Sequence, residues 1–262
     1  MLALMADTPR PALGIDVGGT GVKAALVDVG SGELISKRVR QKTPIPATPD
    51  AVAVTVGEVV AQIAADQPLP AGLPCGCGLP GVVKGGRVLT VANIDQGWLT
   101  VSAEEILGEA IGRRVVTIND ADAAGIAELR LGAGVGQLGT VLLLTVGTGI
   151  GSALFTAGRL VPNTEFGQLE YKGFVAEREL SGTARDRRDL SWAEWATEFD
   201  GYIARMEDHF WPDLIILGGG VSKSFAKFAH LLHSRAQIVP AHFLNSSGII
   251  GAALWAAGLE EG

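Results

Sequence analysis

The sequence predicts a soluble α/β protein whose two lobes share one architecture. Hydrophobic residues make up 47% of the 262 residues, charged residues make up 19%, and glycine occurs 36 times. This composition is typical of a protein with a large core and many tight turns. Two segments, beginning at Leu13 and Leu143, repeat the same order of apolar run, glycine- and threonine-rich turn, and apolar run. The repeat indicates a duplicated fold with a cleft between its lobes.

The two repeated segments each have the pattern of a β-hairpin. The first covers residues 13–26 and the second covers residues 143–154. Another glycine-containing turn and a short apolar stretch follow each hairpin, at residues 34–35 and 160–161. We therefore expect a meander of strands at the start of each lobe.

Apolar residues at helical spacing predict helices between the strands. The first helix covers residues 50–66, with Asp50 as its N-cap after Pro49. Ser102 begins a second helix with a capping-box pattern that ends at Glu105. The remaining predicted elements are helices at 120–131, 192–209 and 249–258, and buried strands at 115–118 and 214–217. These elements predict mixed sheets with helices on both sides, in an N-terminal lobe of residues 1–119 and 248–262 and a C-terminal lobe of residues 120–247.

Charge and composition disfavour several classes of function. The formal net charge is −7, whereas proteins that bind nucleic acid usually present a basic face. No apolar run reaches the roughly 18–20 residues of a membrane span, and residues 1–11 lack the basic start and apolar core of a signal peptide. Cys75 and Cys77 have the spacing of buried thiols on one face of a strand. So low a cysteine content suits the cytoplasm.

The first hairpin turn has the composition of a phosphate-binding loop. Asp16 lies at a strand end, directly before a turn that contains Gly18, Gly19, Thr20 and Gly21. Glycines let backbone N–H groups approach phosphate oxygens, and the threonine adds a hydroxyl donor. Asp16 could hold Mg²⁺ through water, because Mg²⁺ prefers oxygen ligands and keeps several waters. An ordinary hairpin turn with a capping aspartate would have the same residues.

The second hairpin turn repeats this composition in the other half of the chain. Two such loops that face each other across a cleft could hold successive phosphates of a donor. A third glycine turn follows the predicted strand at 214–217. These two turns contribute Thr145, Gly147, Thr148, Gly149, Gly218, Gly219 and Gly220 as candidate donor-binding residues.

A polar triplet follows the predicted strand at 115–118. It contains Asn119 and Asp120, and α/β folds place catalytic groups at the carboxyl ends of strands. Asp120 is therefore a candidate base, with a simple helix N-cap as the alternative. Asp122 fits a first-turn acid that the helix dipole favours.

Three further polar residues fit sugar hydroxyls. Glu165 and Gln168 could each form hydrogen bonds to neighbouring hydroxyls, although a solvated loop would have the same residues. Glu177, on composition alone, could equally be an exposed helix residue.

In combination, these blocks resemble the ROK family of sugar kinases, and within it the polyphosphate glucokinases and polyphosphate/ATP glucomannokinases. The resemblance extends from about residue 13 to residue 255. It rests on seven ordered blocks, which begin at Asp16, Asn119, Thr145, Val161, Leu217, Val239 and Gly248. The resemblance implies an actin-like, hexokinase-type (ribonuclease H-like) duplicated fold.

The resemblance also implies an activity, namely phosphoryl transfer from polyphosphate, and from ATP, to the 6-hydroxyl of glucose. Asp120 would accept the hydroxyl proton and Asn119 would orient the hydroxyl. The implied sugar-binding residues are Asn93, Asn119, Asp120, Glu165, Gln168 and Glu177. Lys23 and the glycine turns would bind the donor with Mg²⁺, and the family expectation is a cytoplasmic homodimer.

Two departures from the family pattern concern metal and sugar. Gln168 stands where the family has histidine, which changes the geometry of the sugar contact. The cysteine-rich zinc motif of most ROK proteins is missing from the sequence, so we expect no zinc site.

Several alternatives remain at this point. They are a strictly ATP-dependent glucokinase or mannokinase, a sugar-responsive transcription repressor, and a sugar-binding pseudokinase suggested by Gln168. About a dozen residues precede Leu13, fewer than the DNA-binding region of a repressor needs. Candidate cations for a polyphosphate path are Lys23, Lys84, Arg159, Lys223 and Lys227.

Overall fold

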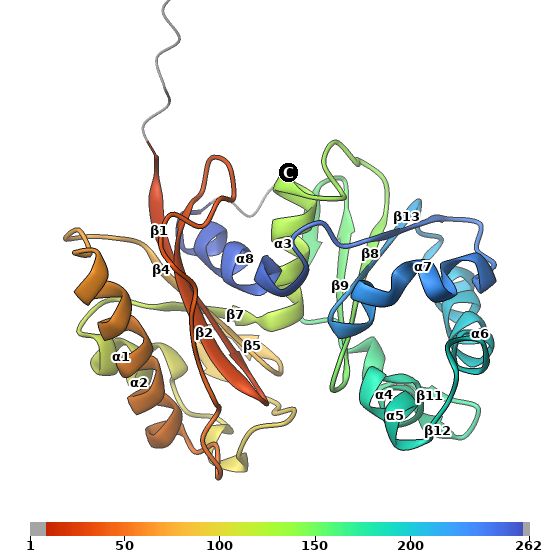
Figure 1. Ribbon diagram of the computed structural model, residues 1–262, viewed down its shortest axis with the longest axis horizontal. Helices are drawn as coiled ribbons and strands as arrows, with labels where there is room; N and C mark the ends of the chain where they lie inside the picture. The colour runs from red at the N-terminus through yellow and green to blue at the C-terminus, as the bar shows by residue number, and fades with distance from the viewer. Residues whose placement is uncertain (1–8, 259–262) are drawn as a thin grey trace, which may run out of the picture.

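The computed structural model describes residues 9–258 and has two lobes side by side (Figure 1). The N-terminal lobe contains a five-stranded sheet. Its strands are β1 (Pro11–Gly18), β2 (Gly21–Asp28), β3 (Val39–Gln41), β4 (Cys75–Leu79) and β7 (Val116–Asn119). A separate hairpin consists of β5 (Val83–Lys84) and β6 (Arg87–Val88).

The C-terminal lobe contains a second five-stranded sheet. Its strands are β8 (Val141–Val146), β9 (Ile150–Thr156), β10 (Arg159–Val161), β13 (Leu214–Gly218) and β14 (Gln237–Pro240). A small hairpin consists of β11 (Glu170–Tyr171) and β12 (Phe174–Val175).

The two sheets have the same topology. Their strand orders are β3-β2-β1-β4-β7 and β10-β9-β8-β13-β14. In each sheet an antiparallel meander is extended by two parallel strands. This equivalence confirms the duplicated fold that the repeated hairpins predict, and it agrees with the hexokinase-type fold that the resemblance implies.

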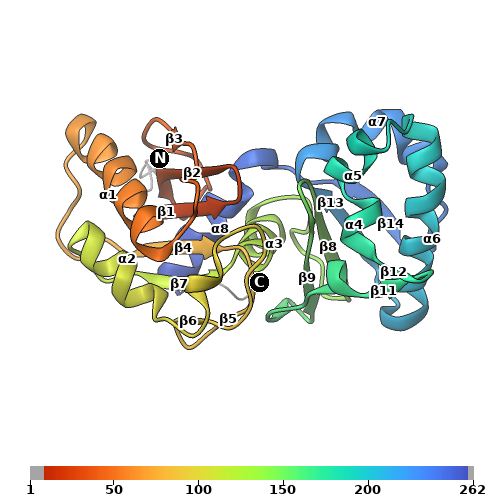
Figure 2. The ribbon, with the colours of Figure 1, turned by 90° about the horizontal axis from the view of Figure 1, so that it is seen from below.

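Helices cover both faces of both sheets (Figures 1 and 2). α1 (Pro49–Asp66) and α2 (Ala103–Ile111) pack on the outer face of the first sheet. α3 (Asp120–Leu131) and α8 (Ser247–Ala256) lie between the two sheets. The second sheet's outer face carries α4 (Ala176–Leu180), α5 (Gly182–Arg187), α6 (Trp192–Phe210) and α7 (Phe225–Phe228). Short 3₁₀ segments are Gln96–Trp98, Phe166–Gln168, Gly220–Ser224, Ala229–Leu231 and Leu244–Ser246.

The packing of α8 places its first turn beside the first hairpin. Gly14 and Gly76 face α8 so closely that a Cβ on either would overlap a carbonyl oxygen of the helix. The glycines therefore let the helix backbone lie directly on the sheet. As a result, a Cβ on Gly248 would lie 3.1 Å from Cγ of Asp16.

Two local predictions were wrong. Residues 34–35 form only an isolated antiparallel bridge, between Leu34 and Val27, and the continuous third strand of the first meander is β3. Beyond the bridge, the Leu26 N–H donates to the Ser36 hydroxyl at 2.9 Å and not to a backbone carbonyl. The N-cap of α1 is Thr48 rather than Asp50, and the Thr48 hydroxyl accepts the Ala51 N–H at 3.4 Å. Pro49 takes the first helical position, where its missing N–H leaves no bond unmade.

Each sheet lies within one of the two lobes predicted from the sequence. The limits of the predicted N-terminal lobe at residues 1 and 262 lie outside the described residues. Cys75 and Cys77 are buried in the core beneath α1 and α2. No helix within residues 9–258 combines the length and apolar character needed to cross a bilayer.

Candidate active site

A cleft of about 270 Å³ brings together most of the predicted site residues from both lobes. Those that line it are Asp16, Gly18, Gly19, Thr20, Lys23, Asn93, Asn119, Asp120, Thr145, Gly147, Thr148, Gly149, Glu165, Gln168, Glu177, Gly219 and Gly220. Gly218 lines a smaller cavity that shares Asp16, Lys23 and Asp120 with the cleft. Gly21 lies outside the lining, at the start of β2, where a Cβ would contact the guanidinium of Arg40.

The junction of β7 and α3 positions the candidate base. Asn119, not Asp120, caps the helix, because its Oδ1 accepts the N–H groups of Ala121 and Asp122, each at 2.9 Å. The Asp120 carboxylate is therefore not needed as the cap and faces the cleft, with one bond from the Ala121 N–H at 2.8 Å. Burial raises the pKa of Asp120 to about 8, and the negative charge of Asp16 adds to the shift.

Asn119 also connects the candidate base to another candidate sugar-binding residue. Its Nδ2 donates to the Gly81 carbonyl at 3.0 Å and to Oε1 of Glu165 at 3.3 Å. Burial and, to a smaller extent, the negative charge of Glu177 raise the pKa of Glu165 to about 6. Since the side chains of Asn119 and Glu165 are fixed relative to each other, one sugar could contact both.

Gln168 and Glu177 form a second linked pair in the cleft. Nε2 of Gln168 donates to Oε1 of Glu177 at 2.6 Å, and Oε2 of Glu177 accepts the Ile150 N–H at 3.3 Å. The carboxylate can only accept, so the amide must present its NH₂ group to it. The amide oxygen of Gln168 then remains as an acceptor for another group.

The two glycine turns meet around Asn93. A Cβ on Gly19 would lie 2.8 Å from Cβ of Asn93, and a Cβ on Gly149 would lie 3.9 Å from its Nδ2. Asn93 itself has a left-handed backbone, with φ of 62°. Gly219 has φ of 74°, and a Cβ there would overlap the backbone of Val146. The turns therefore present bare backbone to the cleft.

The first hairpin contributes the charged side chains of this region. Asp16 and Lys23 are paired residues of β1 and β2, and Nζ of Lys23 lies 2.7 Å from Oδ2 of Asp16. Both side chains are largely buried. Among residues 9–258, no group of three histidine, cysteine, aspartate or glutamate side chains converges as a metal site would require.

Asp122 has a role that its position in the sequence did not reveal. It is buried, and its Oδ2 accepts the Asn163 N–H at 2.7 Å. The Asn163 side chain bonds in turn to the N–H and carbonyl of Val83, at 2.9 and 3.0 Å. Burial raises the pKa of Asp122 to about 7. The loop before Glu165 is thereby tied to the N-terminal lobe by residues that no local pattern could have paired.

The five candidate cations for a polyphosphate path do not all line the cleft. Of these five, Lys23 lines the cleft. Lys84 lies in β5, Arg159 in β10, Lys223 in the 3₁₀ segment Gly220–Ser224, and Lys227 in α7. Sequence reasoning missed Arg40, whose Nη2 donates to the Thr20 carbonyl at 3.0 Å.

Two mycobacterial proteins are similar to this chain in sequence over most of its length. The polyphosphate glucokinase of Mycobacterium tuberculosis (strain CDC 1551 / Oshkosh) is 46% identical over 250 residues, which cover 95% of this chain and 92% of the relative. The polyphosphate glucokinase of Mycobacterium leprae (strain TN) is 42% identical over 264 residues, covering 95% and 80%.

Solved structures match as well. The inorganic polyphosphate/ATP-glucomannokinase from Arthrobacter sp. strain KM has a TM-score of 0.92 and 47% identity, covering 95% of this chain and 98% of its own. A ROK glucokinase from Streptomyces griseus, solved with glucose and AMPPNP, has a TM-score of 0.78 at 24% identity, covers 95% and 99%, and supports the fold alone. The ROK family profile matches residues 12–165. The chain therefore belongs to the ROK family.

Proposed function

We propose that this chain is a glucokinase that transfers a phosphoryl group from inorganic polyphosphate, and also from ATP, to the 6-hydroxyl of glucose. The observation that carries the proposal is the position of Asp120 in a cleft that also holds the Asp16–Lys23 ion pair and the carboxylates of Glu165 and Glu177. Relatives named polyphosphate glucokinases, 46% identical over nearly the whole chain, support polyphosphate as the donor.

Asp120 acts as the base in this proposal. The 6-hydroxyl donates to its carboxylate, the bond between the sugar oxygen and phosphorus forms, and the bond from phosphorus to the bridging oxygen breaks. The leaving group is polyphosphate shortened by one unit, or ADP, and the hydroxyl proton passes to Asp120. The transition state is loose, so positioning of the hydroxyl contributes more than base strength. A pKa of about 8 nevertheless makes Asp120 a stronger base than an ordinary carboxylate.

The C-terminal lobe and Asn93 bind the sugar. The carboxylates of Glu165 and Glu177 accept hydrogen bonds from hydroxyl groups, and the oxygen of Gln168 can accept one more. Asn119 bonds to Glu165 and thereby aligns the sugar with the neighbouring Asp120. Hydroxyl recognition by charged acceptors is strong, about 1.5–3 kcal/mol for each bond.

The glycine turns and Lys23 bind the donor. Backbone N–H groups of the turns can approach phosphate oxygens closely because no Cβ intervenes. Asp16 would hold Mg²⁺ through water, and the ion supplies positive charge that offsets the charge of the donor. One carboxylate without a cluster of further ligands fits an ion that keeps its waters and also binds phosphate.

The test is the formation of glucose 6-phosphate in Mg²⁺ buffer with polyphosphate, with ATP, or with no donor. We expect product with both donors. Product with ATP alone would leave an ATP-dependent kinase and remove the polyphosphate claim. Glucose binding without product from either donor would favour the pseudokinase alternative. Mannose in place of glucose tests the sugar, and light scattering after gel filtration tests the expected homodimer.

A further inference from the structure

A row of three charged residues crosses the first sheet from the cleft to its edge. Asp16 of β1 is paired with Lys23 of β2, and Lys23 is paired with Arg40 of β3. Residues directly opposite each other in neighbouring strands point to the same face of a sheet. Val39, the neighbour of Arg40, packs toward the core under α1 and α2. The row therefore lies on the other face, where Asp16 and Lys23 line the cleft.

The guanidinium of Arg40 lies against the first glycine turn. Its Nη2 donates to the Thr20 carbonyl at 3.0 Å, and a Cβ on Gly21 would lie 2.7 Å from its Nε. Thr20 itself lines the cleft. A guanidinium has five N–H donors, so this contact leaves others that can bind an anion next to the turn.

The strand that carries Arg40 forms an exposed basic edge. β3 is the terminal strand of its sheet (Figure 2), and Arg38 and Lys42 flank it as exposed side chains. We call Arg38, Arg40 and Lys42 the β3 edge. Within residues 9–258, none of these three cations forms an ion pair with a carboxylate, whereas the adjacent Lys37 lies 3.8 Å from Asp66.

The charge of the β3 edge contrasts with its surroundings. The chain has a net charge of −7, yet residues 37–42 contain four cations and no acid. The cleft is lined by four carboxylates but by Lys23 alone among lysines and arginines. The carboxylates of the cleft would repel a linear polyanion, whereas the cations of the β3 edge would attract the part of it that extends out of the cleft.

We propose that the β3 edge binds the part of a polyphosphate chain that continues beyond the phosphates held at the glycine turns. This inference rests on the proposed function. The row from Lys23 to Arg40 leads the polyanion over the tip of the first hairpin, and Arg38 and Lys42 extend the contact along the edge. ATP has no anionic extension beyond its three phosphates, so it gains nothing from Arg38 and Lys42. These residues therefore determine the preference for long donors.

The test uses the double variant Arg38→Gln/Lys42→Gln in the full chain. Arg40 is kept because it bonds to the hairpin turn. Each exposed charge contributes a factor of up to about five, so we expect KM for long-chain polyphosphate to rise roughly tenfold. KM for ATP is expected to change less than roughly twofold, because its phosphates end inside the cleft. The slope of log KM against log salt for polyphosphate should fall by about 0.7 for each lost contact.

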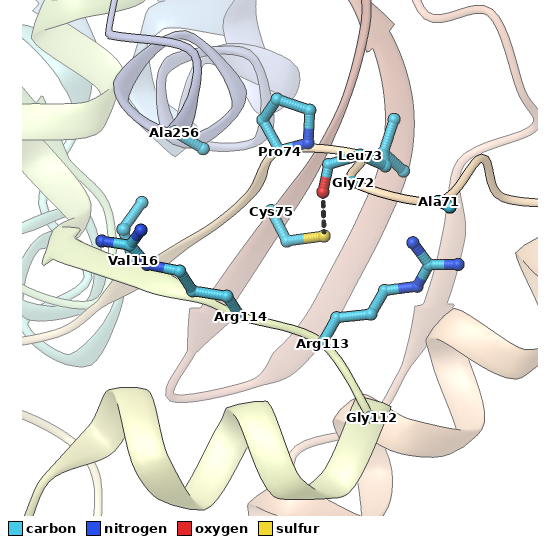
Figure 3. A pocket seen from close by; sticks show the side chains of 10 residues that line it. All are labelled: Ala71, Gly72, Leu73, Pro74, Cys75, Gly112, Arg113, Arg114, Val116 and Ala256. Carbon is cyan, nitrogen blue, oxygen red and sulfur yellow. Dashed lines mark hydrogen bonds between the residues drawn. The ribbon is translucent and has the colours of Figure 1, made fainter.

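A matched control removes an exposed arginine elsewhere in the same lobe. Arg114 precedes β7, at the opposite end of the strand from Asn119, and lines a separate pocket near Cys75 (Figure 3). Arg114→Gln changes the net charge but not the β3 edge. It should leave KM for both donors unchanged. A second comparison variant is Lys223→Gln/Lys227→Gln, which removes the cations of the C-terminal lobe.

The outcomes separate this inference from the function on which it rests. A selective loss for long polyphosphate in the β3 variant supports it. Charged side chains also protect edge strands from aggregation. If that is their role here, the variant will keep wild-type KM for every donor length, and the inference is overturned while the function stands. The inference is also overturned if KM for long polyphosphate rises selectively in the Lys223/Lys227 variant and not in the β3 variant. A wild-type chain that neither turns over nor binds fluorescent polyphosphate would overturn both.

Discussion

The two hairpins of the duplicated fold have equivalent positions but different chemistry. In the first, Asp16 faces Lys23 across the strand pair and forms an ion pair. In the second, Thr145 faces Gly151, so the equivalent site has no charge. Both Asp16 and Thr145 precede a valine that is buried in the core on the outer face of its sheet. The duplication thus preserves the framework while the side chains facing the cleft have diverged.

Packing against the helices that lie between the two sheets explains why the second hairpin is neutral. A Cβ on Gly151 would lie 2.5 Å from the Thr145 hydroxyl and 2.8 Å from Cβ of Ala121 in α3. A lysine therefore has no room at position 151. The first hairpin faces Gly248 at the start of α8, and this glycine leaves space for the Asp16 carboxylate. Which helix residue meets each hairpin decides which hairpin can be charged.

The largest expected effect concerns Asp120, which belongs to neither hairpin. Asp120→Asn should lower kcat by roughly 10²–10⁴-fold with either donor, because it removes the base while retaining the shape of the side chain. Glucose affinity, measured by calorimetry, should fall much less. A loss that appears with only one donor would show that Asp120 acts on the donor and would break the assignment of donor binding to the hairpins.

The raised pKa of Asp120 gives this variant a second readout. In wild type, kcat/KM should rise with pH up to about 8, where the carboxyl loses its proton. The folded-state pKa lies above the unfolded value near 4, so the native state binds more protons and wild-type stability falls as pH rises through this interval. The melting temperature of Asp120→Asn minus that of wild type should therefore increase from pH 5 to pH 8. Parallel melting curves would contradict the shift.

A smaller effect is expected from Glu177, which contacts the second hairpin through the Ile150 N–H. Glu177→Gln should raise KM for glucose by roughly 10–100-fold, because hydrogen bonds to a charged acceptor are the strong ones. KM for the donor should stay close to the wild-type value. A comparable rise in KM for polyphosphate would mean that the second hairpin binds sugar and donor as one unit.

The hairpins themselves can be compared by a pair of near-isosteric variants. Lys23→Met should raise KM for both donors by roughly tenfold, since it removes a charge that faces phosphate. Thr145→Val should raise it by less than about fivefold, because a neutral hydroxyl contributes about 1 kcal/mol or less. Steady-state kinetics at fixed Mg²⁺ decide the comparison. Equal effects would contradict the chemical division between the two hairpins.

The smaller of the two effects expected on sugar binding concerns Gln168. Gln168→Ala removes the 2.6 Å bond that holds Glu177, and KM for glucose should rise roughly threefold to fivefold with little change in kcat. Gln168→His provides the matched control, since an imidazole N–H can donate to the same carboxylate. If alanine has no effect while Glu177→Gln does, Glu177 is held by the Ile150 N–H alone.

The sequence by itself determined the repeated hairpins, most helices and many of the residues that line the cleft. These features depend on local patterns, such as the glycine turn after Asp16 and the polar triplet that begins α3. The errors were local too. Proline at the first helical position moved the cap of α1 to Thr48, and residues 34–35, followed by the Ser36 hydroxyl that accepts the Leu26 N–H, form a single bridge and not a strand.

Only the tertiary structure decided the electrostatics of the site. The pKa shift of Asp120 requires burial together with Asp16, which lies 104 positions away in the chain. The tie from Asp122 to Asn163, and the contact of Arg40 with the first glycine turn, likewise join residues far apart in sequence. Desolvation and charge proximity are properties of the packed arrangement, so no local sequence pattern contains them.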